Sequence, residues 1–236
     1  MGAPGDGPDG SEGSDRAFVD LHCHTSASFD SLAAPASVVR AAASRGLTHV
    51  AVTDHGTLAG ALEAREHAPD GVTVLVGEEI RTLEGDLIGV FLSRAIPNGL
   101  PAAEAIAAIR EQGGLVGIPH PFDRFRGSVG RRDSLIELSA SVDWIEAWNA
   151  RLIVGDGNVR AAELAASTGL PGVAVSDAHT TVEIGVASTI VRGDPSTPDG
   201  LLAALAGERQ LMTGRASVYT RLVTPAAKLV TWARSR

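Results

Sequence analysis

Several features that mark other classes of protein are missing from this sequence. Cys23 is the only cysteine among 236 residues, so an intrachain disulfide is excluded. There is no run of 18 apolar residues, which argues against a membrane span. The first residues show neither the basic start nor the apolar stretch of a secretory signal. We therefore expect a cytoplasmic protein that makes no use of a membrane.

Positive charge is also scarce, and the formal net charge is −8. Proteins that bind duplex DNA non-specifically usually present a basic face. The single local basic run here is RFRGSVGRR. The composition therefore argues against long nucleic acid as a partner. A small anionic substrate stays compatible with it, because bound metal ions and a few arginines can reverse the local field.

The chain divides into a short tail and one large domain. Residues 1–16 are rich in Gly, Pro, Asp and Ser without apolar periodicity, so we expect a disordered tail. From Ala17 to residue 236, short apolar runs alternate with Ala-rich stretches, as expected for strands and helices. The predicted helices are 35–45, 57–67, 100–112, 158–168 and 198–205, with an amphipathic helix over 224–236.

The order of these elements predicts a barrel. Continuous apolar strands that alternate with helices indicate a parallel sheet with helices on its outside. About seven repeats favour a closed or nearly closed α/β barrel over an open doubly wound sheet. The dinucleotide-binding form of the open sheet is excluded, because no Gly-x-Gly-x-x-Gly follows the first strand.

Ionisable or amide side chains stand at the end of nearly every predicted strand. They are His22 and His24, Asp54 and His55, Glu78 and Glu79, His120, Glu146 and Asn149, and Asp177 and His179. In a β/α barrel the carboxyl ends of the strands form the face where active sites assemble. Burying many charged groups together is costly unless a cation pairs with them. Imidazole and carboxylate together suit Zn, Mn or Fe, so the pattern predicts a metal centre.

Taken singly, these residues have ordinary structural explanations. One His-x-His is weak evidence, Asp54 or Asp177 could cap a helix, and His120 between two prolines could be a turn residue. Glu78 and Glu79 cannot both point inward, so we expect one of them to be solvated or paired with an arginine. The joint occurrence at successive strand ends favours the metal centre.

A series of motifs in this order resembles the PHP domain, the polymerase and histidinol phosphatase family. The motifs are DLHCHTSASFDS, AVTDHGTLAGALEA, GEEIRTLEGD, PHPFDRFR, EAWNAR and SDAHT. The resemblance covers about Ala17 to Gly193. It implies a single-domain, distorted (β/α)7 TIM-like barrel. It also implies a phosphoesterase that uses two or three divalent ions, variously Zn, Mn, Fe or Mg.

The resemblance further implies which residues hold the ions. Glu79 would bridge a first and a second metal, and Asp54 would lie behind the ligands. The implied metal ligands are His22, His24, Asp30, His55, Glu79, His120, Asp177 and His179.

The sequence departs from the family at one metal position. Many members carry a further histidine between the bridging glutamate and the next histidine. Between Glu79 and His120 this chain has none. Asp86 is the nearest candidate replacement.

These roles imply hydrolysis of a small phosphorylated metabolite or nucleotide. Bound ions would contact the phosphoryl oxygens and activate a water molecule for in-line attack on phosphorus. Arg124 and Arg126 could clamp the phosphate or could equally be surface arginines on a long loop. The residues predicted to act in catalysis are Glu79, Asp177 and His179, and those predicted to bind substrate are Arg124, Arg126 and Asn149.

Three other functions stay open on sequence grounds. A urease-like amidohydrolase also has His-x-His after its first strand. Lys228, the only lysine, lies in the predicted terminal helix, which excludes the subtype that bridges its metals with a carboxylated lysine. The domain could also be a nuclease or proofreading module, as in bacterial DNA polymerases that carry PHP domains. It could finally be a non-catalytic, metal-stabilised binding module.

Overall fold

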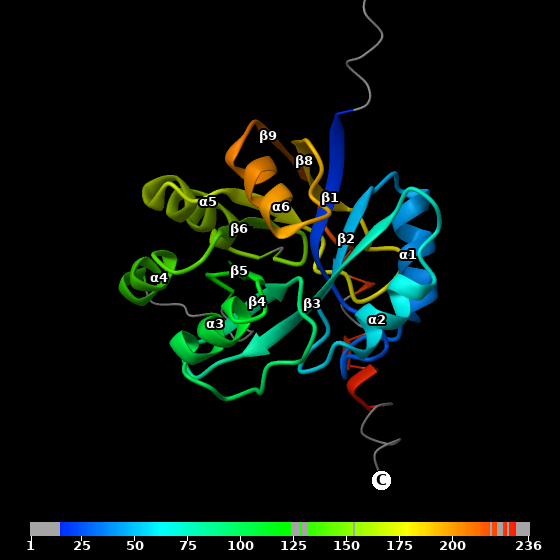
Figure 1. The fold of residues 1–236 in the computed structure, drawn as a ribbon, viewed down its shortest axis with the longest axis horizontal. Helices are drawn as coiled ribbons and strands as arrows, with labels where there is room; N and C mark the ends of the chain where they lie inside the picture. Colours follow the sequence, from blue (N-terminus) through cyan, green and yellow to red (C-terminus); the bar gives the residue numbers. More distant parts are fainter. Residues whose placement is uncertain are drawn as a thin grey trace, which may run out of the picture.

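The computed structural model describes residues 15–123, 128, 132–152, 154–217, 219–220, 224–225 and 227–229. Strands and helices alternate along most of this part of the chain (Figure 1). The strands are β1 (Arg16–Cys23), β2 (His49–Val52), β3 (Thr73–Arg81), β4 (Asp86–Val90), β5 (Leu115–Ile118), β6 (Trp144–Asn149), β7 (Gly172–Val175), β8 (Ala187–Arg192) and β9 (Arg209–Thr213). The helices are α1 (Pro35–Ser44), α2 (Ala59–Glu66), α3 (Ala102–Arg110), α4 (Arg132–Ser139), α5 (Gly157–Thr168) and α6 (Pro198–Ala206).

The strands form one nine-stranded sheet in the order β7-β6-β5-β4-β3-β2-β1-β8-β9. The sheet curls until the chain after β7 returns to the end of β1. There the amide of Asp177 donates to the carbonyl of His22 (2.9 Å), and the amide of His24 donates to the carbonyl of Ala178 (2.8 Å). Helices α1 and α2 lie beside β2 and β3, and α4 and α5 lie towards β5 and β6 (Figure 1). The predicted α/β barrel is therefore confirmed, as a nearly closed one.

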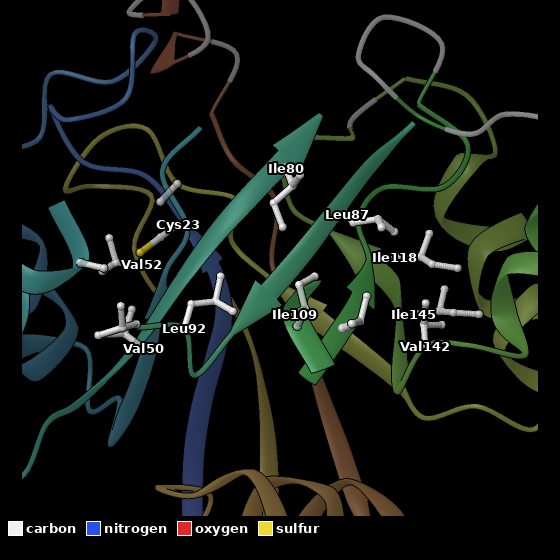
Figure 2. Close-up of a cluster of buried hydrophobic side chains, with 14 of the residues drawn as sticks. Cys23, Val50, Val52, Ile80, Leu87, Leu92, Ile109, Ile118, Val142 and Ile145 are labelled. Carbon is white, nitrogen blue, oxygen red and sulfur yellow. The ribbon is translucent and has the colours of Figure 1, made fainter. Parts of the chain in front are cut away.

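Two apolar layers hold the barrel together. The inner layer joins alternate strand residues such as Leu21, Leu75 and Ile88 to Leu201 and Leu205 of α6. The outer layer packs the other strand faces against the helices, and Figure 2 shows part of it. Complete burial of one such Leu or Ile side chain stabilises the fold by roughly 1.5–3 kcal/mol. The strand faces are therefore fixed by apolar burial, and the polar strand ends are fixed with them.

An irregularity in β1 changes which side chains face inward. Val19 and Leu21 face the inner layer, whereas Cys23 belongs to the outer layer. The pairing of β1 with β2 shifts register between Asp20 and Cys23, as at a β-bulge. A bulge inserts one residue and re-aims the side chains that follow it. The side chains of His22 and His24 thereby turn towards the carboxyl end of the barrel.

Three strands differ from the prediction of a parallel sheet. β8 pairs antiparallel with both β1 and β9, and β4 pairs antiparallel with both β3 and β5. Only residues 82–85 connect β3 to β4, and a parallel pair would need a crossover of a dozen residues or more. The prediction also omitted α4 and β9. β9 is half-buried or exposed along its whole length, so it lacks the apolar pattern that marks a strand.

The ends of the domain are only partly described. β1 begins at Arg16, one residue before the predicted start of the domain. Residues 1–14 and most of the predicted helix 224–236 lie outside the described residues. Within the described part of the chain, none of the helices is long and apolar enough to cross a membrane.

Glu78 and Glu79 separate as the strand alternation requires, but Glu78 is not solvated. Its side chain is fully buried, Oε2 accepts a hydrogen bond from the amide of Ile96 (2.8 Å), and Oε1 has no partner among the described residues. The prediction that one glutamate would be solvated or paired with an arginine was therefore wrong. Burial raises the pKa of Glu78 from 4.5 to about 7, although the Ile96 amide opposes the rise.

We expect Glu78→Gln to stabilise the protein above neutral pH. Because the folded-state pKa lies above the unfolded value, the stability that Glu78 contributes is present below about pH 4.5. It is lost as the pH rises through about 7. Removing the buried charge should raise the unfolding temperature near pH 8 by roughly 2–4 °C, or about 1 kcal/mol. Thermal unfolding at pH 5 and pH 8 measures this, with exposed Glu66→Gln as control. An equal shift at both pH values would contradict it.

Candidate metal centre

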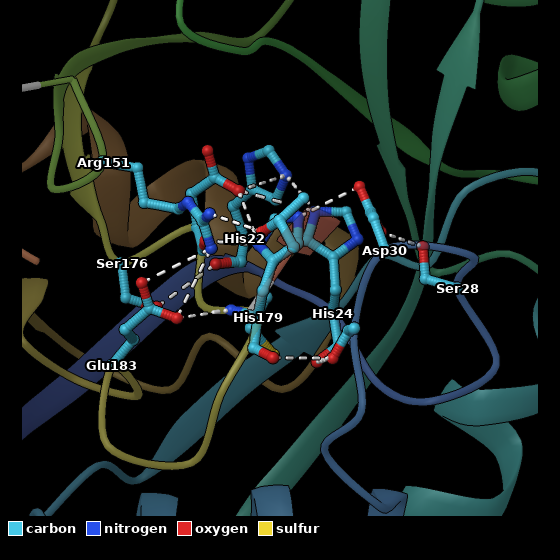
Figure 3. Close-up of polar contacts among 12 residues, drawn as sticks. His22, His24, Ser28, Asp30, Arg151, Ser176, His179 and Glu183 are labelled. Atoms are coloured by element: carbon cyan, nitrogen blue, oxygen red, sulfur yellow. Dashed lines mark hydrogen bonds and ion pairs between the residues drawn. The ribbon is translucent and has the colours of Figure 1, made fainter. Parts of the chain in front are cut away.

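Side chains from the strand ends converge at the carboxyl end of the barrel. His22 Nε2 lies 3.0 Å from His24 Nε2 and 3.2 Å from Glu79 Oε2. Asp177 Oδ1 lies 3.7 Å from His22 Nε2 and 3.6 Å from His24 Nε2. Figure 3 shows His22, His24, Asp30 and His179 drawn together at this point. All of these side chains are buried. The strand-end residues therefore share one centre.

Three groups in this centre could each hold a metal ion. In each group the potential ligand atoms lie within 4.8 Å of one another. The groups are His22, His24 and Asp177; then His24, Asp30, His55 and His179; and then Glu79, Asp86 and His120. All eight residues predicted to bind metal lie in these groups, and Asp86 joins them. Their role as ligands remains a prediction, but the structure brings every one of them together.

Glu146 and Asn149 of β6 contact the candidate ligands and orient them. Glu146 Oε1 lies 2.6 Å from His22 Nδ1, and Glu146 Oε2 accepts from the amide of His120 (2.8 Å). Asn149 Nδ2 donates to Glu146 Oε2 (2.9 Å) and to Asp177 Oδ2 (3.0 Å). A carboxylate on the far nitrogen of a histidine fixes the ring and directs its other nitrogen at a metal. Asn149, predicted to bind substrate, is buried and placed to position Asp177.

The backbone is strained at two of these residues. Asp177 has φ of 51° and His120 has φ of 27°. L-residues rarely adopt this left-handed region, and each such position costs roughly 1–3 kcal/mol. Strain of this kind persists where the surrounding structure determines it, commonly at functional sites. Both residues carry ligand atoms of the candidate centre.

The ionisable groups of the centre shift the pKa values of one another. Burial opposes protonation of His22 and His24, but the surrounding carboxylates outweigh it. Glu146, Asp177 and Glu79 raise the pKa of His22 well above its usual range, and Asp177 and Glu79 raise that of His24 to about 9. Burial also opposes ionisation of Glu79, and the histidines nevertheless hold its pKa well below its usual range.

These groups fit divalent ions. In the metal-free protein, protons on His22 and His24 offset part of the charge of the buried carboxylates, and ions would take the place of those protons on binding. His24 Nδ1 is buried and has no hydrogen-bond partner among the described residues. Buried polar atoms are normally satisfied, so an orphaned ring nitrogen beside carboxylates is consistent with a metal site.

A cavity of about 180 Å³ lies over the centre. It is lined by ionisable residues of the centre and by three cationic side chains, with Phe29 and Thr224. The residues of the centre are Asp30, His55, Glu79, Asp86, Asp177 and His179, and the cationic ones are Arg81, Arg151 and Lys228. Pockets for drug-sized ligands are usually about 300–1,000 Å³. The space is therefore that of a small ligand.

Arg151 is the arginine that the sequence interpretation missed. It is almost fully buried (6% exposed), Nη2 donates to Thr224 Oγ1 (2.8 Å), and Nη1 lies 3.4 Å from Glu183. Its position two residues after Asn149, at a strand end, was the available signal. Arg124 and Arg126, which were predicted to bind substrate, lie outside the described residues.

Comparisons with known proteins agree with this geometry. The PHP domain profile matches residues 20–147, and a PHP-associated profile matches residues 155–209. An uncharacterized protein of Methanocaldococcus jannaschii is 38% identical over 143 residues, which cover 56% of this chain and 81% of that protein. A 5'-3' exoribonuclease of Haemophilus influenzae is 32% identical over 117 residues, 44% of this chain and 42% of the exoribonuclease. The chain thus spans less than half of that enzyme.

A solved structure is similar in fold. It is a two-domain protein of Bacteroides vulgatus described as containing a predicted PHP-like metal-dependent phosphoesterase. The TM-score is 0.70 at 19% identity, over 84% of this chain and 65% of that chain. At this identity the similarity concerns the fold alone.

Proposed function

The chain belongs to the PHP domain family, and from that premise we propose that it is a metal-dependent phosphoesterase acting on a small phosphorylated metabolite or nucleotide. One observation carries the proposal. Nine histidine and carboxylate side chains converge next to a cavity that is also lined by Arg81, Arg151 and Lys228. The centre can hold cations, and the walls attract an anion.

The proposed ion-binding residues are those of the three groups, with Zn, Mn or Fe as the ions that suit imidazole and carboxylate. Divalent ions bound there would neutralise phosphoryl oxygens and lower the pKa of a water molecule. Glu79 is placed to join two groups. Oε1 lies 3.0 Å from His120 Nε2, while Oε2 lies 3.2 Å from both His22 and His24.

Other side chains would bind and orient the substrate. Arg151 is held by Glu183 and Thr224, and a fixed guanidinium matches two oxygens of a phosphate group. Arg81 and Lys228 add positive charge to the cavity walls of an acidic protein. Burial, together with the charge of His24, lowers the pKa of His179 to about 4. Its ring is therefore neutral near pH 7, the form in which imidazole binds a metal ion.

A nuclease is the second candidate, because of the similarity to the exoribonuclease. The end of a nucleic acid strand would present a phosphoester to the same cavity. The net negative charge of the chain argued against long nucleic acid as a partner. Cleavage of nucleic acid is nevertheless one of the outcomes that the test distinguishes. An amidohydrolase activity is kept in the same way.

The test combines elemental analysis of the purified protein with an activity screen in added Mn²⁺, Zn²⁺ or Fe²⁺. Substrates are phosphorylated metabolites, nucleoside monophosphates, a 5'-phosphorylated oligoribonucleotide, and amides and lactones. We expect bound divalent ions and phosphate release from a small ester. Stepwise release of nucleotides from the oligomer would favour the nuclease. Hydrolysis of amides or lactones alone would overturn the phosphoesterase proposal.

A further inference from the structure

We propose that Asp86 is a metal ligand of this centre, and that with Glu79 and His120 it forms a carboxylate-rich position that accepts Mn²⁺. The inference rests on the proposed metal centre and deepens it. Asp86 stands between Glu79 and His120 in the sequence, where many family members have a histidine instead. An aspartate in place of a histidine changes the donor atom that this position offers from nitrogen to oxygen.

The antiparallel direction of β4 places Asp86 at the mouth of the barrel. β3 ends at the mouth, so β4 begins there, and Arg81 pairs with Asp86 while Glu79 pairs with Ile88. Ile88 and Val90 face the inner layer and Leu87 faces the outer one. By this alternation, the side chain of Asp86 shares the inner face with Ile88. It is then the diagonal neighbour of Glu79 across the two strands.

Burial makes an uncompensated Asp86 costly. Asp86 and Glu79 are 3% and 2% exposed, and two buried carboxylates repel each other unless a cation lies between them. Arg81 Nε lies 3.5 Å from Asp86 Oδ1, and the Arg81 side chain is 61% exposed. That distance is longer than an effective hydrogen bond, and exposed ion pairs contribute little. A divalent ion near Glu79 and His120 would balance both carboxylates.

The donor atoms distinguish this position from the other two. The group of Glu79, Asp86 and His120 offers two carboxylates and one imidazole. The group around His24 and His179 offers three imidazoles and one carboxylate, and the group around His22 offers two imidazoles and one carboxylate. Oxygen donors suit Mn²⁺, whereas imidazole suits Zn²⁺. Zn²⁺ should therefore fill the histidine-rich groups first and leave the Asp86 position to Mn²⁺.

Metal binding to the full chain tests this without an activity assay. The metal-free protein is given two equivalents of Zn²⁺ and then titrated with Mn²⁺, with free Mn²⁺ followed by electron paramagnetic resonance. We expect the wild type to bind about one Mn²⁺ per chain under these conditions. Asp86→Asn should weaken that binding at least tenfold, because even residues behind metal ligands cost about 10–100-fold when replaced.

Asp86→His provides the selectivity readout. It turns the position into two imidazoles and one carboxylate, so the affinity ratio of Zn²⁺ to Mn²⁺ should rise about tenfold or more. Exposed Asp70→Asn is the matched control and should bind both ions like the wild type. Circular dichroism of each metal-free variant establishes that it is folded. Wild-type Mn²⁺ affinity in Asp86→Asn, or an unchanged ratio in Asp86→His, would overturn the inference.

The outcome separates this inference from the proposed function. Mn²⁺ bound through Asp86 in a protein that cleaves none of the phosphoesters would support the ligand and overturn the phosphoesterase. Phosphoester cleavage by a protein whose Mn²⁺ affinity is unchanged in Asp86→Asn would support the phosphoesterase and overturn Asp86 as a ligand.

Discussion

Glu79→Gln is expected to lower phosphoester turnover by about 10³-fold or more, which corresponds to roughly 4 kcal/mol of transition-state stabilisation. The two oxygens of Glu79 face different groups, His120 on one side and His22 with His24 on the other. Glutamine has the same size but removes the charge and replaces one oxygen with a donor. Two ion positions are thereby weakened by one substitution.

The measurement pairs kcat with elemental analysis of the same preparation. The variant should bind fewer divalent ions per chain than the wild type. Exposed Glu66→Gln should match the wild type in both. Unchanged turnover and metal content in Glu79→Gln would remove the proposed mechanism.

Loss of Arg151 is expected to lower kcat/KM by about 10²-fold, because the guanidinium orients the phosphate of the substrate. Arg151→Lys keeps the charge but loses the planar fork, so it should recover only part of the activity. Binding of inorganic phosphate by the metal-loaded protein should weaken in parallel. Wild-type kcat/KM in Arg151→Met would contradict the role.

Stability needs a separate control at this position. Arg151→Met alone leaves Glu183 buried without its cation, and breaking a buried pair commonly costs about 3–5 kcal/mol. The double variant Arg151→Met with Glu183→Gln removes both charges and keeps an acceptor for the amide of His179. We expect it to recover much of the lost stability but not the lost activity. Recovery of activity as well would assign Arg151 a purely structural role.

Sequence reasoning located the site because strand geometry is simple. Side chains alternate along a strand and parallel strands end at one face, so residues as distant as His22 and Asp177 could be placed together. The same rule does not identify Asp86, which begins an antiparallel strand and does not end a parallel one; the resemblance to the family alone pointed to it. Recognising that required the short β3–β4 connection to be taken as a hairpin.

Other features of the site depend on tertiary packing. The Thr224 hydroxyl that holds Arg151 comes from a segment 73 positions later in the chain, which no local pattern links to it. The buried carboxylate of Glu78 accepts a hydrogen bond from the amide of Ile96, 18 positions later in the chain. Cavity shape and long-range partners of this kind follow from how loops pack, and the periodicity of single strands does not encode them.

The extra residue in β1 has a consequence for how such proteins diverge. The side chains before the extra residue and those after it follow two separate alternation patterns. The residues before it fill the barrel interior, and the residues after it present imidazoles to the centre. Because the two patterns are independent, apolar residues before the extra residue can be exchanged for others without changing the direction of the His22 or His24 side chain. At this strand, stability and chemistry can therefore evolve along separate paths.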